Sequence, residues 1–140
     1  MPLALTPAAL ARLRRVCLGI TLFWFVVGGL AHFVAIDFFV RITPPWVPEP
    51  RAVVIWSGVL ELVLAALLLS PRWRPLAGWA LIGVICAVSF ANIHMWLHPE
   101  LFPEAPRWVY TARLILQVGL IWCVWFGTRV PGRLTTTSAS

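Results

Sequence analysis

Charged residues are scarce in this chain of 140 residues: they occupy 11% of the positions, whereas hydrophobic residues occupy 61%. A soluble domain has about a quarter of its residues charged. The chain therefore has too few polar side chains to cover a water-facing surface. This composition excludes a disordered polar tail, a disulfide-rich scaffold and an ordinary cytosolic enzyme, and it leaves an integral membrane protein.

Lysine is absent, so the 11 basic residues are all arginine and the net charge is +6. A basic chain often binds nucleic acid, but that requires cations clustered on one face. Here the arginines are scattered between apolar runs, and only Arg12, Arg14 and Arg15 come close to a cluster. We expect them to orient helices in a membrane, and we expect no nucleic-acid partner.

Cysteine is also rare, and Cys17, Cys86 and Cys123 lie in three different apolar runs without a C-x-x-C pattern. This spacing argues against a thioredoxin-like dithiol and against covalently attached haem. The sequence contains no iron–sulfur pattern and no flavin fingerprint either. The identity of any cofactor therefore stays open, and the thiols are expected to pack as small hydrophobic side chains.

Four stretches with at most one charged residue predict the architecture. Each has the roughly 20 residues that a helix needs to cross the hydrocarbon core, and none has the alternating pattern of barrel strands. We predict an all-α, antiparallel, integral membrane four-helix bundle. Its spans are expected near residues 16–36, 52–70, 75–97 and 108–127.

The remaining segments are expected to connect or flank these spans. Residues 1–15 are predicted to form a short amphipathic cytoplasmic lead-in, and residues 128–140 a disordered cytoplasmic tail. Residues 37–41 are predicted to form a partly buried segment at the membrane interface. The proline-rich stretch 43–50 cannot continue a helix.

The distribution of charge predicts the orientation of the bundle. One side carries seven arginines and no acidic residue, namely Arg12, Arg14, Arg15, Arg72, Arg74, Arg129 and Arg133. The other side carries all four acidic residues that lie outside the spans. Because short arginine-rich segments stay in the cytoplasm, we expect both termini to be cytoplasmic.

Several polar residues inside the predicted spans need an explanation, because a charge near the bilayer centre costs about 2.5–3.5 kcal/mol. With a helical rise of about 1.5 Å per residue, they all lie roughly 7–14 Å from the outer ends of their helices. We therefore expect one shared polar layer in the outer half of the membrane. Its members are His32, Glu61, Asn92, Arg113 and Gln117.

Within this layer we predict an ion pair between Glu61 and Arg113, because a guanidinium can grip a carboxylate with two hydrogen bonds. Gln117 and Ser57 are expected to donate hydrogen bonds to the remaining lone pairs of the Glu61 carboxylate. Two interpretations stay open: a polar pin that locks the helices, or a ligand site.

Two histidines are weak candidates for metal ligands. His94 and His98 are four residues apart, so a helix continuing through residue 98 would present both imidazoles on one face. His32 or Glu100 would then have to complete the site. Pro99 ends the helix at that point, so the expected metal content is none.

The order of these motifs resembles the DoxX-like family of small four-helix bacterial membrane proteins, which is related to the DoxD and MauE groups. The resemblance covers about residues 16–127. It is carried by Gly29-Leu30-Ala31-His32-Phe33, Phe39 to Pro48, Ser57-Gly58-Val59-Leu60-Glu61, Ala91-Asn92-Ile93-His94-Met95 and Arg113-Leu114-Ile115-Leu116-Gln117. The family's motif positions fall on His32, Pro44, Pro45, Glu61, Asn92, Arg113 and Gln117.

The resemblance implies a multi-pass protein of the bacterial inner membrane that is associated with redox chemistry. Two departures limit it: the chain has no paired cysteines, and His94 stands where an aromatic residue is expected.

Three functions follow as alternatives. The first is a non-catalytic subunit or accessory factor of a membrane redox system, with other redox subunits as partners.

The second alternative is a quinone-linked component. In it Arg113 and Gln117 donate to a quinone carbonyl, while Glu61 or His32 carries a proton. The third is a protein that binds or isomerises a small lipophile with Glu61 as general acid/base. Whether the chain is an enzyme stays open.

Overall fold

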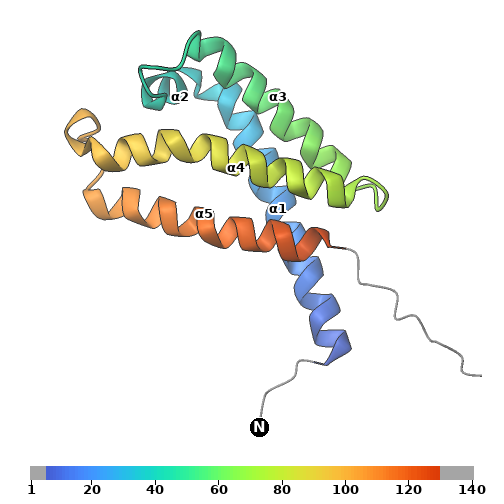
Figure 1. The fold of residues 1–140 in the computed structure, drawn as a ribbon. Helices are drawn as coiled ribbons and strands as arrows, with labels where there is room; N and C mark the ends of the chain where they lie inside the picture. Colours follow the sequence, from blue (N-terminus) through green and yellow to red (C-terminus); the bar gives the residue numbers. More distant parts are fainter. Residues whose placement is uncertain (1–5, 130–140) are drawn as a thin grey trace, which may run out of the picture.

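The computed structural model describes residues 6–129, and every regular element within them is helical (Figure 1). The elements are α1 (Pro7–Val34), α2 (Ile36–Ile42), α3 (Pro50–Leu68), α4 (Arg74–Leu97), the 3₁₀ turn η1 (Pro99–Leu101) and α5 (Arg107–Thr128). Four of these helices are long and apolar enough to cross a membrane, namely α1, α3, α4 and α5. The chain is thus a multi-pass membrane protein, and the predicted all-helical class is confirmed, with four helices long and apolar enough to be spans.

The boundaries differ from the predicted spans at several ends. Helix α1 begins at Pro7, where the Thr6 side chain accepts a hydrogen bond from the Ala9 amide at 3.2 Å. Residues 7–15, expected as a separate lead-in, are therefore continuous with the first span. That span ends at Val34, and the interfacial segment is the separate helix α2. The predicted tail beyond residue 129 lies outside the described residues.

Proline sets where three of the four long helices start. Pro7, Pro50 and Pro75 occupy the first or second position of α1, α3 and α4. The missing amide hydrogen of proline costs nothing there, because the first amides of a helix have no partner within it. Prolines therefore end the loops and begin the spans.

The four long helices form a ring of neighbours. Helix α1 packs against α3 and α5, and α4 packs against the same two helices. In Figure 1, α4 and α5 lie side by side along their length, while α1 crosses them. Helices α3 and α5 consequently face each other across the diagonal of the ring. Leu68, Leu81 and Val124 fill the centre and are fully buried.

The outer surface of the ring is strongly apolar. Phe23, Trp56 and Val118 are each 69% exposed, and Trp79 is 63% exposed. In water such a surface would aggregate. In a bilayer these side chains meet acyl chains or other membrane helices, in agreement with the composition of the sequence.

Two glycines let α1 and α3 approach at close range. A Cβ atom on Gly58 would lie 2.7 Å from the His32 Cβ and 3.0 Å from the Gly29 carbonyl oxygen. A Cβ atom on Gly29 would lie 3.1 Å from the Gly58 carbonyl oxygen. Small residues at such positions allow tight packing between membrane helices. This close contact places His32 directly on α3.

We expect Gly58→Ala to destabilise the protein by about 1–3 kcal/mol, because the new methyl group meets main-chain and Cβ atoms that cannot rotate away. Gly119→Ala is the matched control, since a Cβ atom there meets nothing within 4 Å. Thermal unfolding in detergent, followed by tryptophan fluorescence, measures both. Equal melting temperatures for the two variants would contradict the close α1–α3 contact.

Candidate functional site

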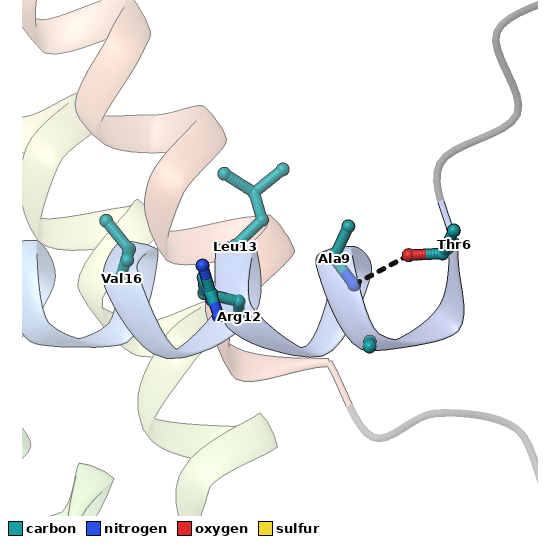
Figure 2. A pocket seen from close by; sticks show the side chains of 6 residues that line it. Thr6, Ala9, Arg12, Leu13 and Val16 are labelled. Carbon is teal, nitrogen blue, oxygen red and sulfur yellow. Dashed lines mark hydrogen bonds between the residues drawn. The ribbon is translucent and has the colours of Figure 1, made fainter.

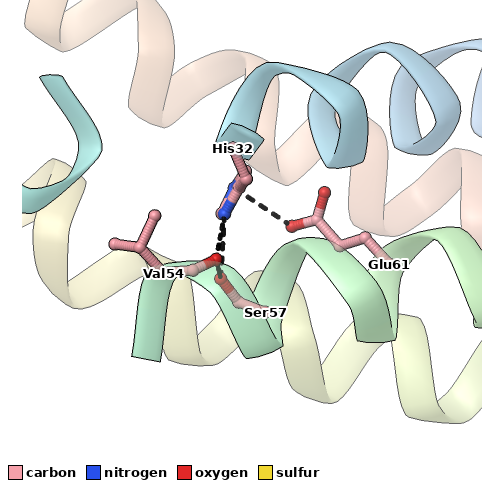
Figure 3. A network of polar contacts seen from close by, with 4 residues as sticks. All are labelled: His32, Val54, Ser57 and Glu61. Atoms are coloured by element: carbon pink, nitrogen blue, oxygen red, sulfur yellow. Dashed lines mark hydrogen bonds and ion pairs between the residues drawn. The ribbon is translucent and has the colours of Figure 1, made fainter. Parts of the chain in front are cut away.

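A buried histidine joins α1 to α3. The His32 side chain is 8% exposed, and its Nδ1 atom lies 2.9 Å from the Val54 carbonyl oxygen and 2.9 Å from the Ser57 hydroxyl oxygen. The Ser57 hydroxyl lies 2.9 Å from the same carbonyl oxygen and donates to it. Figure 3 shows the imidazole reaching from α1 toward these two groups on α3.

These contacts determine where the imidazole carries a proton. A carbonyl oxygen only accepts hydrogen bonds, so Nδ1 must donate to Val54. Since Ser57 already donates to that carbonyl, its oxygen is also an acceptor toward Nδ1. The Nδ1–H group thus faces α3, and the second ring nitrogen, Nε2, faces Glu61.

Glu61 lies on the other side of the imidazole. It is 5% exposed, and its Oε1 atom is 3.8 Å from the Nε2 atom of His32. Its Oε2 atom points at Gly28, where a Cβ atom would come within 3.2 Å. The absence of a side chain at residue 28 therefore makes room for the carboxyl group.

Together His32 and Glu61 form an acid–base pair. With one proton between them, the pair is either a neutral acid beside a neutral imidazole or a carboxylate beside an imidazolium. Both forms have no net charge, so the pair avoids the cost of an isolated charge in lipid.

An aromatic ring fixes the imidazole from a third element. Phe39 on α2 stacks on His32 with ring centroids 4.1 Å apart and an interplanar angle of 28°. The short helix α2, which packs on α3, therefore covers the histidine. Neither Phe39 nor the Val54 carbonyl was among the predicted site residues. A main-chain acceptor cannot be recognised from the residue type, and Phe39 was identified only within the interfacial segment and the Phe39 to Pro48 motif.

A second polar contact joins α4 to α5. The Nε atom of Arg113 donates to the Asn92 side-chain oxygen at 3.2 Å, and both residues are half-buried. No carboxylate within residues 6–129 lies at ion-pair distance from Arg113. Its two Nη nitrogens donate to no protein group in this part of the chain. Among the described residues, Nε is therefore the one guanidinium nitrogen that has a protein acceptor.

The predicted ion pair between Glu61 and Arg113 is wrong. Glu61 lies against His32, whereas Arg113 lies against Asn92. The reason is the order of helices around the ring, which puts α3 and α5 on a diagonal and gives each polar residue a partner on an adjacent helix. The polar residues of the predicted layer thus form two separate contacts, one between α1 and α3 and one between α4 and α5.

Other predicted site residues have different surroundings than expected. Ser57 bonds to Val54 and His32 and not to Glu61. Gln117 is half-buried on α5 and makes no side-chain hydrogen bond within residues 6–129.

The two histidines expected as weak metal ligands lie near each other. The rings of His94 and His98 have centroids 4.8 Å apart, although α4 ends at Leu97 and His98 only caps it. The Nδ1 atom of His98 lies 3.2 Å from the Glu100 carboxylate. Among residues 6–129, however, no three His, Cys, Asp or Glu side chains are arranged as a metal site.

The two ends of the bundle differ in how their charges are compensated. At the end carrying α2 and η1, Arg41 pairs with Glu104 at 2.5 Å and Arg51 pairs with Asp37 at 3.3 Å. At the opposite end the described residues include arginines but no acidic residue. This contrast agrees with the charge bias that predicted the orientation.

A hollow runs along the first turns of α1 (Figure 2). All of its lining residues come from that helix and its N-cap, so no second element closes it. They are Thr6, Ala8, Ala9, Arg12, Leu13 and Val16. The hollow is a stretch of exposed helix surface and not an enclosed site.

Residues 21–128 match the family model described as a domain of unknown function, DUF8561, and the chain belongs to that family. No curated protein and no solved structure matches the chain. The matched residues include both polar contacts.

A double-mutant cycle tests whether His32 or Arg113 interacts with the Glu61 carboxyl group. We expect His32→Leu and Glu61→Leu to couple by about 1 kcal/mol, because the two side chains face each other in a low-dielectric interior. Glu61→Leu and Arg113→Leu should instead add within about 0.5 kcal/mol, since they lie on diagonal helices. Unfolding in detergent gives the free energies. A larger coupling for the second pair would restore the ion pair that we reject.

The Arg41–Glu104 contact has a testable pH dependence. Hydrogen bonding from its own main-chain amide, and then from Arg41, lowers the pKa of Glu104. A lowered folded-state pKa means that this contact stabilises the loop above the ordinary glutamate pKa of about 4.3. The stabilisation is lost as the pH falls through the lowered value.

We expect an NMR titration of the Glu104 carboxyl carbon to give a midpoint below about 4.3. Arg41→Gln should raise that midpoint only in part, because the amide contributes more than Arg41 does. Arg51→Gln, which removes the separate pair with Asp37, should leave it unchanged. An unshifted midpoint in Arg41→Gln would show that the contact is not formed in solution.

Proposed function

We propose that this member of the DUF8561 family is a non-catalytic subunit or accessory protein of a redox system in the bacterial inner membrane. The observation that carries the proposal is how the buried polar groups are used. His32, Ser57 and Glu61 are packed between two adjacent helices at a contact set by glycines. Such a contact fixes the register of one helix against the other.

The burial of Glu61 gives less support to an isomerase. A general acid/base needs to reach its substrate within hydrogen-bond distance. Glu61 is 5% exposed and lies against Gly28 and His32. A lipophilic substrate would have to separate α1 from α3 before it met the carboxyl group.

The redox association and the bacterial inner membrane come from the resemblance to DoxX-like proteins. The uneven distribution of arginines supports an orientation with both termini in the cytoplasm. Exposed aromatic side chains on the outer surface, such as Trp56 and Trp79, suit contact with lipid or with helices of partner subunits.

A quinone-binding role is a second candidate, which the free donors of Arg113 favour. Its Nη nitrogens have no protein acceptor among residues 6–129, while Asn92 holds the guanidinium through Nε. A quinone carbonyl is an acceptor of suitable chemistry for such donors. In this role Arg113 orients the head group, and electrons come from a partner subunit or a bound cofactor.

A thermal shift with a soluble quinone analogue separates the two roles. For the accessory role we expect decylubiquinone to change the melting temperature of the purified full chain by no more than about 1 °C. A quinone at a hundred times its dissociation constant would stabilise the protein by about 2.7 kcal/mol, a shift of several degrees. Loss of that shift in Arg113→Gln but not in Arg51→Gln would favour the quinone role.

The accessory role also predicts a phenotype of its own. In native membranes lacking the gene, we expect wild type and Arg113→Gln to restore the same redox complex on native gels. Gly58→Leu should restore much less, because it forces α1 away from α3. If an empty vector restored the redox complex equally well, the accessory role would be contradicted.

A further inference from the structure

One end of the bundle holds six arginines without a compensating acidic residue among residues 6–129. They come from the start of α1, the loop before α4, the first residue of α4 and the residue after α5. They are Arg12, Arg14, Arg15, Arg72, Arg74 and Arg129. Uncompensated cations next to a membrane attract anionic headgroups, with about 1 kcal/mol from each basic residue near the surface.

A shallow groove of about 30 Å³ lies between α4 and α5 at this same end, where Gly78 packs against Thr128. Its walls are largely apolar and include two tryptophans, and an arginine stands at its rim. The lining residues are Pro75, Gly78, Trp79, Ile82, Trp125, Thr128 and Arg129. Two helices contribute to it, unlike the hollow in Figure 2, which lies on α1 alone.

The arginine at the rim is held in place by its neighbours. The Arg129 guanidinium lies 3.7 Å from the centroid of the Trp125 ring. Arg14 on α1 donates to the Arg129 carbonyl oxygen at 3.4 Å and lies over Phe126. Arg14 on α1 thus reaches the main chain of Arg129, and neither arginine pairs with a carboxylate among the described residues.

We propose that this groove binds one anionic phospholipid. The phosphate contacts Arg129, with Arg14 and the positive N-terminal end of α4 adding to the attraction. The acyl chain lies over the shallow groove, against the apolar surface formed by Trp79 and Trp125. The apolar walls and the cationic rim match the two halves of such a lipid, and the proposal does not depend on the redox role.

The opposite end provides a control with the same chemistry. Arg107 lies over the Trp96 ring at 5.3 Å, so it is also an arginine stacked on a tryptophan. It stands beside a loop that carries Glu100 and Glu104. Removing its charge tests whether any stacked arginine, or only the one at the groove, selects anionic lipid.

Native mass spectrometry of the full chain in detergent tests the proposal with dioleoyl phosphatidylglycerol and dioleoyl phosphatidylcholine as probes. We expect wild type to retain phosphatidylglycerol in preference to phosphatidylcholine. Arg129→Gln should reduce that preference about fivefold, the factor expected from one basic residue. Arg107→Gln should preserve it, and Trp125→Leu should reduce retention of both lipids.

Three outcomes would overturn the proposal: equal retention of the two lipids by wild type, equal effects of Arg129→Gln and Arg107→Gln, or displacement of the lipid by inorganic phosphate. The last result would assign the site to a free anion. Arg129→Lys guards against a folding defect, because it keeps the charge and should keep the preference for the anionic lipid.

Discussion

The close contact between α1 and α3 governs the interior of this protein. Gly29 and Gly58 bring the two main chains together, and only at that distance does the His32 imidazole reach the Val54 carbonyl. Lipid offers no water to polar groups, so the His32 imidazole is satisfied by Val54 and Ser57 and lies 3.8 Å from the Glu61 carboxyl group. The apolar core around Leu68 and Leu81 then completes the packing that this contact begins.

The ring order of the helices divides the remaining polar chemistry into two kinds. Between α1 and α3, an acid and a base are buried 3.8 Å apart. Between α4 and α5, the Nε atom of Arg113 donates to the Asn92 side-chain oxygen, and no other side chain among residues 6–129 accepts from Arg113. The first arrangement suits a stable structural contact, and the second suits a group that receives acceptor atoms from outside the chain. Both kinds of polar contact thus occur in a chain of 140 residues.

Much of the fold was predictable from the sequence, whereas the pairing of side chains was not. Apolar runs of about 20 residues have one stable solution in a bilayer, so the four spans followed from length alone. The polar residues in them were identifiable because lipid makes each of them costly. Their partners depend on which helices are adjacent. The spacing of residues along the chain predicts how deep each one lies in the membrane, but not which helices lie next to each other. Glu61 and Arg113 were therefore matched by charge, although α3 and α5 lie on a diagonal. The role of the Val54 carbonyl was also beyond prediction, since every residue has one.

The unbroken course of α1 from Pro7 links the protein to the thickness of its membrane. Its 28 residues extend for about 42 Å, and Figure 1 shows its first turns passing beyond the end of α5. The apolar part, residues 16–34, accounts for about 28 Å of that length, close to the 30 Å of a typical hydrocarbon core. A thicker bilayer would draw the turn carrying Arg15 into acyl chains, whereas a thinner one is tolerated by tilting. Hydrophobic matching along α1 thus favours residence in thinner membranes.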